Sequence, residues 1–236
     1  MSDRTGSRWQ SILETCALVV IAAAVARNAF VRAAPEPVAR PGALAARPAV
    51  PIPRDPVSLS GAQVSGSRGA KVAMIVYSDF QCPFCGKFAR ETLPAVERQY
   101  VDSGKLLLAF RQYPLPIHNF AEKAAEASLC AAKQGKFWQF HDDLFANQQS
   151  LDPNALTERA VRLGLDSSAF KTCLSGEAAP LVQADVKGGT PLGVSGTPTF
   201  LVGRLQKDGS VKVEERFSGA QPLSQFQGVL DKLIGS

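Results

Sequence analysis

Two cysteines three positions apart follow a strand-like segment, and this arrangement constrains the fold more than any other feature of the chain. Residues 71–80 (KVAMIVYSDF) form an almost continuous apolar run, rich in β-branched residues, as expected for a strand buried on both faces. Cys82 and Cys85 come directly after it, and from Pro83 onward apolar residues recur at helical spacing. The cysteine pair is therefore predicted at a strand-to-helix junction.

A C-x-x-C pair is commonly a zinc ligand pair, a structural disulfide or a redox couple. A zinc site needs four ligands, but the chain has one such pair, and its two histidines, His118 and His141, each lie in a helical context of their own. A structural disulfide over so short a loop would stabilise the fold little. The redox interpretation is the one that uses the position of the pair.

The start of a helix favours a thiolate. The first N–H groups of a helix are unpaired, and the positive end of the helix dipole lies beside the first sulfur, so we expect a lowered pKa for Cys82. Pro83 suits the first helical position, which needs no N–H donor. Cys82 is thus predicted to be an exposed nucleophile, and Cys85 the buried thiol that resolves the mixed disulfide.

The rest of the folded part reads as β-α-β, a helical segment, then β-β-α. Pro94 should kink or restart the first helix, and the first two strands should be parallel with a right-handed crossover. Asp152 is a plausible helix N-cap followed by proline. The remaining elements are expected at residues 106–115 (strand), about 119–180 (helical), 197–203 and 211–219 (strands), and 222–234 (helix). The aromatic residues Phe137, Trp138, Phe140 and Phe145 are expected in the core of the helical segment, and His141 is expected to pack or bond within its helix.

The first thirty-two residues have the layout of an export signal. Two arginines within the first eight residues precede an apolar run over residues 16–26, which ends in small residues that suit a signal peptidase. The run is about half of the roughly 20 residues that span a bilayer. Residues 1–32 are therefore predicted to be a cleaved signal peptide or a short membrane anchor, and the Pro/Ala-rich residues 33–56 an extended linker.

The amino-acid composition excludes few classes of protein. With 45% apolar and 20% charged residues, the chain is typical of a globular protein. The net charge of +5 is not gathered into a Lys/Arg cluster interleaved with aromatic residues, so nucleic acid is not expected as a partner. No metal and no cofactor are expected either.

Four motifs in order carry a resemblance. YSDFQCPFCGKF, FRQYPLPIH, AAEASLCAAKQGKFWQFHDDLF and GVSGTPTFLV together resemble the DsbA-like thiol-disulfide oxidoreductases of the thioredoxin superfamily. The resemblance covers residues 57–236 and implies an α/β thioredoxin fold with an inserted helical subdomain. It implies exchange through Cys82 and Cys85, with Pro83 and Phe84 supporting the site, and Thr197 and a cis Pro198 facing the sulfurs and pairing with an extended substrate.

One position departs from the pattern of such oxidoreductases. They often carry a buried acid six positions before the nucleophile, where this chain has Val76. The proton acceptor for Cys85 is therefore unassigned by sequence, with water, Lys87 or another group as candidates. Asp79 is the nearest carboxylate, and a capping or loop-facing role is favoured for it.

Cys130 and Cys173 lie in the predicted helical segment. Disulfides persist in the oxidising compartments that an export signal implies, and two unpaired thiols there would be liabilities. We therefore predict a structural disulfide between these two cysteines.

The sequence predicts an exported thiol-disulfide oxidoreductase that introduces disulfides into secreted or periplasmic proteins. We expect it in the periplasm or on the outer face of the cytoplasmic membrane, with or without an N-terminal anchor. The resemblance implies a membrane partner of the DsbB or VKOR type that reoxidises it. A disulfide reductase or isomerase acting from the dithiol form, a non-catalytic chaperone or peptide-binding module, and a metal-binding module are the alternatives.

Overall fold

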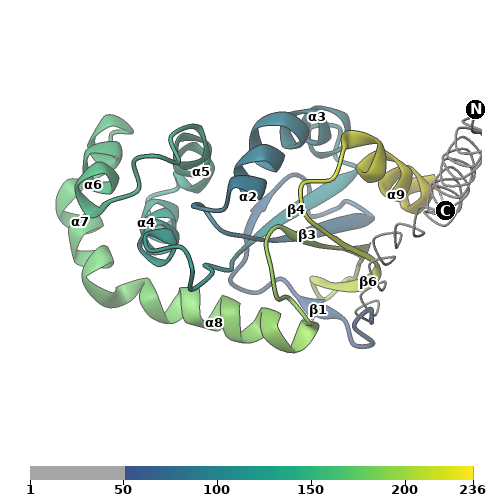
Figure 1. Cartoon of the computed structure of the whole chain (residues 1–236). Helices are drawn as coiled ribbons and strands as arrows, with labels where there is room; N and C mark the ends of the chain where they lie inside the picture. Colours follow the sequence, from purple (N-terminus) through teal and green to yellow (C-terminus); the bar gives the residue numbers. More distant parts are fainter. Residues whose placement is uncertain (1–50, 236) are drawn as a thin grey trace, which may run out of the picture. The chain divides into compact units, whose positions relative to one another are not determined.

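A six-stranded mixed sheet lies at the centre of the folded part of the chain (Figure 1). The computed structural model describes residues 51–235, so the predictions for residues 1–50, the signal or anchor and most of the linker, lie outside it. Residues 51–56 form neither helix nor strand. The strand order is β1-β6-β5-β3-β4-β2. The strands are β1 (Val57–Ser58), β2 (Gln63–Ser65), β3 (Val72–Ser78), β4 (Leu106–Gln112), β5 (Thr199–Leu205) and β6 (Ser210–Ser218).

The two strands predicted first form the middle of this sheet. All seven residues of β3 are buried, as its continuous apolar run predicted. β3 pairs with β4 in parallel, with Val76 opposite Phe110, and with β5 in the antiparallel direction. The predicted β-α-β unit is therefore confirmed, while the short strands β1 and β2 at the two edges carried too few residues to show a pattern.

The connection between β3 and β4 is a broken helix. It consists of α2 (Pro83–Lys87), the π-helical turn η1 (Phe88–Thr92), α3 (Leu93–Val96) and a second π-helical turn, η2 (Glu97–Val101). Pro94 is the second residue of α3, where its missing N–H costs no hydrogen bond. The predicted restart of the helix at this proline is confirmed.

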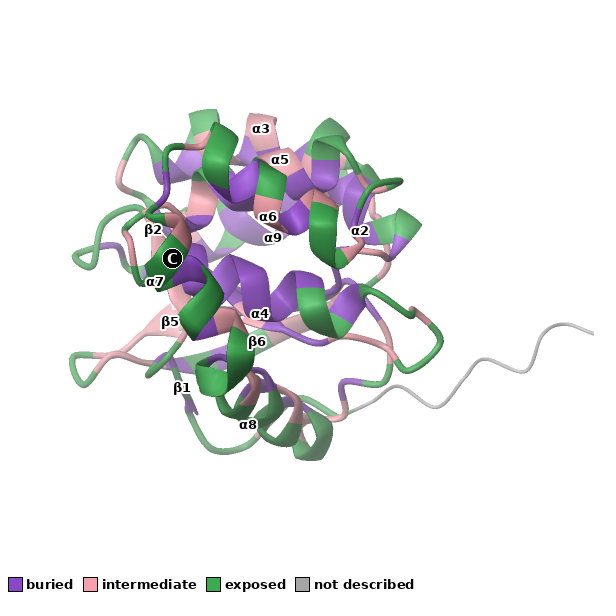
Figure 2. Cartoon of the chain, turned by 90° about the vertical axis from the view of Figure 1, so that its left-hand side faces the viewer, coloured by how far each residue is buried: buried purple, intermediate pink, exposed green. Residues whose placement is uncertain are grey.

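The helical segment is longer than the sequence suggested. It comprises α4 (Ala121–Ala132), α5 (Phe137–Ala146), α6 (Pro153–Arg162), α7 (Ser167–Thr172), the π-helical turn η3 (Cys173–Glu177), α8 (Ala179–Gly189) and the 3-10 turn η4 (Thr190–Leu192). Helix α8 extends past the predicted end at about residue 180. It was missed because few of its residues are buried, so its apolar period is weak; Figure 2 shows this exposure beside the buried α4.

Local signals elsewhere in this segment were correct. Asp152 caps α6 by accepting hydrogen bonds from the N–H groups of Asn154 and Ala155. The predicted aromatic core is confirmed, with Phe137, Phe140 and Phe145 buried and Trp138 half-buried against them. His141 is buried among these rings, and its Nδ1 lies 2.8 Å from Asp142 Oδ1.

Two apolar clusters cover the two faces of the sheet. One contains Val76, both cysteines of the C-x-x-C pair and the buried face of α9 (Leu223–Gly235). That face consists of Phe226, Val229, Leu230 and Leu233, as predicted. The other contains Tyr77 and Tyr113, and Val186 of α8 packs against it. Since neighbouring strand residues point to opposite faces, the redox pair lies on the Val76 side.

A disulfide joins α4 to the start of η3. It links Cys130 and Cys173, 43 residues apart in sequence, and both cysteines are buried. It closes a loop that contains α5, α6 and α7.

Replacing Cys130 and Cys173 together with Ser should lower the free energy of unfolding. Opening a loop of this length returns entropy to the unfolded chain worth about 4 kcal/mol in the loop-closure model. Urea unfolding without reductant measures the difference, with Cys82→Ser and Cys85→Ser present in both proteins so that the Cys130–Cys173 disulfide stays intact in the reference. A loss below about 1 kcal/mol would contradict a stabilising role for this disulfide.

Candidate active site

Cys82 and Cys85 lie where strand β3 passes into helix α2. Cys82 occupies the position before the first helical residue, with an extended backbone (φ −69°, ψ 123°), and Pro83 takes the first helical position. Cys85 follows within the first turn. Both cysteines are free thiols, so the structure shows the dithiol form.

The expected exposure of Cys82 is wrong. Only 3% of its surface is accessible, and Cys85 is fully buried. The Cys82 thiol donates a hydrogen bond to the Thr197 carbonyl at 3.4 Å, so the loop ahead of β5 covers the sulfur. The Thr197–Pro198 peptide bond in that loop is cis. Between the two cysteines, Phe84 is 60% exposed and Pro83 is exposed as well, so these two residues carry the accessible surface of the motif.

The two thiols differ strongly in acidity. The pKa of Cys82 is lowered from its ordinary value of 9.0 to about 5, chiefly because the Cys85 thiol donates a hydrogen bond to it, while burial opposes this shift. The Thr197 side chain and the N–H groups of Cys85 and Phe84 lower the pKa further. The start of helix α2 therefore lowers the pKa of Cys82 as expected, but the Cys85 thiol lowers it more.

Cys85 is held in its neutral form. Burial raises the pKa of its thiol well above the usual range, and the neighbouring Cys82 raises it further. The Asp79 N–H lies 3.4 Å from Cys85 Sγ, and the Ser78 side chain also hydrogen-bonds this sulfur. Val76 is buried in the core, as its side chain requires, and Lys87 is exposed. Among the described residues, backbone and hydroxyl donors therefore surround Cys85 Sγ.

Asp79 binds the backbone of the loop between β3 and α2. Its buried Oδ1 accepts hydrogen bonds from the N–H groups of Gln81 (2.7 Å) and Cys82 (3.2 Å). Both donors precede the first helical residue and no side chain caps α2, so of the two expected roles Asp79 has the loop-facing one. Its Oδ2 accepts the Leu115 N–H (2.8 Å) and lies 2.7 Å from His118 Nδ1. The pairing of His118 with Asp79 joins the loops that follow β3 and β4.

Sequence reasoning missed a second support, Gln148, in the loop after α5. Its Nε2 donates to the carbonyl oxygens of Phe80 and Cys82, each at 2.9 Å. Its Oε1 accepts from Arg90 Nη1 at 3.0 Å, and a Cβ on Gly86 would lie 1.9 Å from that oxygen. The glycine after C-x-x-C was the available signal, since it leaves room for another chain segment.

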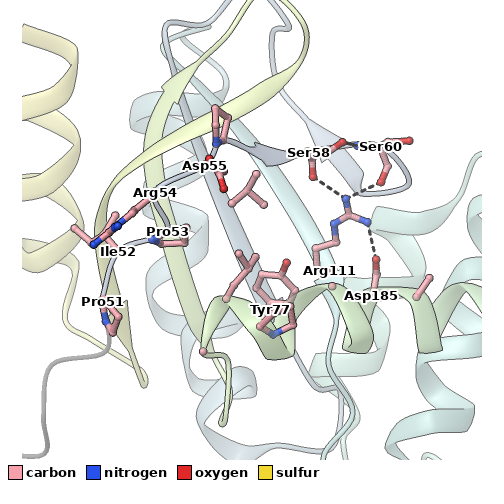
Figure 3. A pocket seen from close by; sticks show the side chains of 17 residues that line it. Pro51, Ile52, Pro53, Arg54, Asp55, Ser58, Ser60, Tyr77, Arg111 and Asp185 are labelled. Atoms are coloured by element: carbon pink, nitrogen blue, oxygen red, sulfur yellow. Dashed lines mark hydrogen bonds and ion pairs between the residues drawn. The ribbon is translucent and has the colours of Figure 1, made fainter.

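A large cavity lies away from this site. Its volume is about 770 Å³, and it lies between the segment before β1, Tyr77, and α8 with the turn that follows it (Figure 3). Arg111 bridges its walls, bonding Asp185 Oδ1 at 2.6 Å and the Ser60 carbonyl at 2.6 Å. Because Tyr77 belongs to the cluster on the opposite face from the cysteines, we do not assign the redox chemistry to this cavity.

A family model with the description Thioredoxin matches residues 59–220, more than half of the chain. The chain belongs to the thioredoxin family. The model spans β3 with the C-x-x-C pair, the helical segment and the cis Pro198, so the α/β thioredoxin fold with a helical insertion is confirmed.

Solved structures of DsbA type share this fold. Alpha-DsbA1 of Wolbachia pipientis matches with a TM-score of 0.68 and 27% identity, over 76% of this chain and 94% of that one. BdbD of Bacillus subtilis matches with a TM-score of 0.66 and 22% identity, over 77% and 100% of the two chains. A thioredoxin-like oxidoreductase of Silicibacter pomeroyi gives 0.59 and 26%, over 75% and 94%. The DsbA-like resemblance read from the sequence is confirmed.

The curated relatives carry a different name. A Na(+)/H(+) antiporter NhaA of Salinispora tropica is 38% identical over 161 residues, 67% of this chain, and one of Mycobacterium is 32% identical over 151 residues, 62% of this chain. The chain spans about a quarter of the length of these proteins (24%). The name antiporter therefore describes those longer proteins. Among residues 51–235, no helix combines the length and apolar character needed to cross a membrane.

The pKa of Cys82 predicts how stability changes with pH. A thiol whose folded pKa is depressed stabilises the folded dithiol form above the unfolded value, and this contribution is lost as pH falls through about 5. The stability of the dithiol form minus that of the Cys82–Cys85 disulfide form should therefore rise between pH 5 and 9. Taking this difference cancels other shifted groups that are shared by both forms, such as Glu97, His141 and Asp185. A flat difference across this range would contradict the lowered pKa.

Replacing Gln148 with Glu should raise the pKa of Cys82. The change removes the amide donor to the Cys82 and Phe80 carbonyls and adds a negative charge near the thiolate, so we expect a rise of about one unit. The pH dependence of iodoacetamide alkylation of Cys82 measures it. Gln149→Glu is the matched control, because it adds the same charge one residue away on an exposed side chain. Equal shifts in both variants would show that charge alone acts, without the Gln148 contacts.

Proposed function

We propose that this thiol-disulfide oxidoreductase oxidises reduced exported proteins by transferring the Cys82–Cys85 disulfide to them. One observation carries the proposal: the pKa of Cys82 falls to about 5, while Cys85 stays a neutral thiol beside it. A stabilised thiolate favours the dithiol form, and a protein whose dithiol form is stabilised has a disulfide that accepts electrons readily. This difference in acidity supports the oxidising direction of exchange.

The cycle begins with attack of a substrate thiolate on the Cys82 sulfur of the disulfide. The S–S bond breaks, a mixed disulfide forms at Cys82, and Cys85 leaves with the electron pair and takes up a proton. A second substrate thiolate then attacks the substrate sulfur of the mixed disulfide, and Cys82 leaves as a thiolate. Two substrate thiols have lost two electrons, and the Cys82–Cys85 pair has gained them.

Several contacts suit these steps. The Cys85 thiol donates to Cys82, so it stabilises the departing Cys82 thiolate at the end of the cycle. The buried Thr197 hydroxyl has no hydrogen-bond partner within the described residues of the dithiol form, so it is available to a thiolate at the same position. The Thr197 carbonyl lies 3.4 Å from Cys82 Sγ, where an extended substrate peptide can pair with the backbone of this loop.

The proposal includes an exported location and a reoxidising partner. An enzyme that has given up its disulfide needs an electron acceptor to act again, and a membrane protein of the DsbB or VKOR type supplies one in the DsbA-like group that the sequence resembles. The signal-like residues 1–32 support export to the periplasm or to the outer face of the membrane.

Replacing either Cys82 or Cys85 with Ser should abolish oxidation of a reduced, unfolded test protein, because neither variant can carry the Cys82–Cys85 disulfide that is transferred. The pair Cys130 and Cys173 stays intact in both variants. The measurements are disulfide formation in the test protein by mass, and the reduction potential of the Cys82–Cys85 pair in glutathione buffers. We expect a potential well above the roughly −270 mV of thioredoxin. A potential near that value would favour the reductase alternative, and full activity of Cys82→Ser would remove the assignment.

A further inference from the structure

A second pocket lies beside the redox centre, between the β4–α4 loop and helix α8. We call it the loop–α8 pocket. Its volume is about 580 Å³, within the range of sites that hold small ligands or side chains. The loop wall consists of Pro114, Leu115, Pro116, His118 and Asn119, with Glu122 of α4, and the helix wall of Val182, Gln183, Val186 and Lys187.

The lining suits an apolar group. Prolines and Leu115 form much of one wall, and Val182 and Val186 lie on the other. The charged residues Glu122 and Lys187 are exposed and opposite in sign, so the pocket offers no net charge that would select an ion. Burial of an apolar side chain against such walls is favourable by about 25 cal/mol per Å² of surface removed from water.

Hydrogen bonds place this pocket close to the nucleophile. His118, on the loop wall, lies 2.7 Å from the Asp79 carboxylate, and the same carboxylate accepts the Cys82 N–H at 3.2 Å. Two hydrogen-bond lengths and the width of a carboxylate therefore put His118 Nδ1 within roughly 8 Å of the backbone nitrogen of Cys82. Since an extended peptide advances about 3.3 Å per residue, a side chain two to four residues from a cysteine bound at Cys82 can reach the pocket.

Exposed apolar side chains gather at the same place. Six large apolar side chains of the described residues are at least 40% exposed. Three of them, Phe84, Ile117 and Phe120, belong to the cysteine motif and to the loop that lines the pocket. The two loops touch, because the Phe120 N–H donates to Gln81 Oε1 at 2.7 Å. Exposed apolar surface concentrated in this way indicates an interaction site.

We propose that the loop–α8 pocket binds an apolar side chain of the substrate peptide, two to four residues from the cysteine that reacts with Cys82. The inference rests on the proposed function, which supplies the substrate class: cysteine-containing segments of unfolded exported proteins, extended and with apolar side chains exposed. The pocket then selects among cysteines by their neighbours in sequence. We assign this peptide as the occupant of the pocket. The test below distinguishes binding in the pocket from a preference for the Leu peptide that arises at another surface.

The test uses the full protein in its disulfide form and two reduced peptides. Each peptide has one cysteine, and they differ only by Leu or Ser three residues from it. The rates of mixed-disulfide formation are measured in the Cys82–Cys85 disulfide form by rapid mixing and quenching. Each rate is divided by the rate of the same variant with dithiothreitol, which needs no pocket. We expect the Leu peptide to react about tenfold faster, as the burial of a leucine side chain predicts.

Charge placed in the pocket should remove this preference. Val186→Asp puts a carboxylate on the α8 wall, and Pro116→Asp, at an exposed loop position, does so from the other wall in case the helix variant does not fold. Val161→Asp is the matched control, since Val161 is 57% exposed on α6 and does not line the pocket. The ratio of Leu to Ser rates should fall to near one in the pocket variants and stay near ten in the control.

Each other outcome has a definite meaning. Equal rates for both peptides in the unaltered protein would overturn the pocket assignment and leave the proposed function standing. A preference that persists in both pocket variants would place the selectivity on another surface, such as Phe84, and would also overturn the assignment. A disulfide that reacts neither with dithiothreitol nor with either peptide would overturn the proposed function, and the pocket assignment with it.

Discussion

The pairing of β3 with its two neighbours is the constraint on which the rest of the site depends. Because β3 and β4 are parallel, the loops that follow them, with Cys82 and His118, emerge at the same edge of the sheet. β5 runs antiparallel to β3, with Thr199 opposite Tyr77, so its first residues bring Thr197 and Pro198 to that edge as well. Three segments distant in sequence thus meet without a long loop.

Two polar side chains, the buried Asp79 and the half-buried Gln148, then fix the backbone at Cys82 from both sides. Asp79 accepts the Cys82 N–H, and Gln148 donates to the Cys82 carbonyl. A buried carboxylate would be costly without partners, but Asp79 has four hydrogen-bond partners, and Gln148 has three. With the backbone held, Cys85 can donate to Cys82 at a fixed geometry, and this bond contributes most to the low pKa of Cys82.

Hydrogen bonds connect the helical insertion to the rest of the fold at both of its ends. At its start, Phe120 donates to Gln81 just before α4. After its end, the hydroxyl of Tyr113, the residue that follows β4, donates a hydrogen bond to the Val194 carbonyl at 2.6 Å. Val194 lies in the segment that leads from α8 to Pro198. Its middle supplies Gln148. A change in the insertion can therefore reach Cys82 through direct hydrogen bonds, and the wall that α8 gives to the loop–α8 pocket stands beside the same loops.

Patterns among residues close together in sequence predicted most of the helices and strands, and they predicted the redox pair but not the groups around it. The apolar run of β3, Pro83 after Cys82, the cap at Asp152 and the apolar face of α9 each act within one element, so their patterns predicted those elements. The burial of Cys82, the role of Gln148 and the pairing of His118 with Asp79 depend on segments 39 to 115 residues apart. No local pattern records such contacts, because they exist only once the parallel strands have brought the loops to one edge. The sequence by itself therefore determined the redox pair and its strand-to-helix position, while the tertiary structure decided which groups surround the sulfurs and set their acidity.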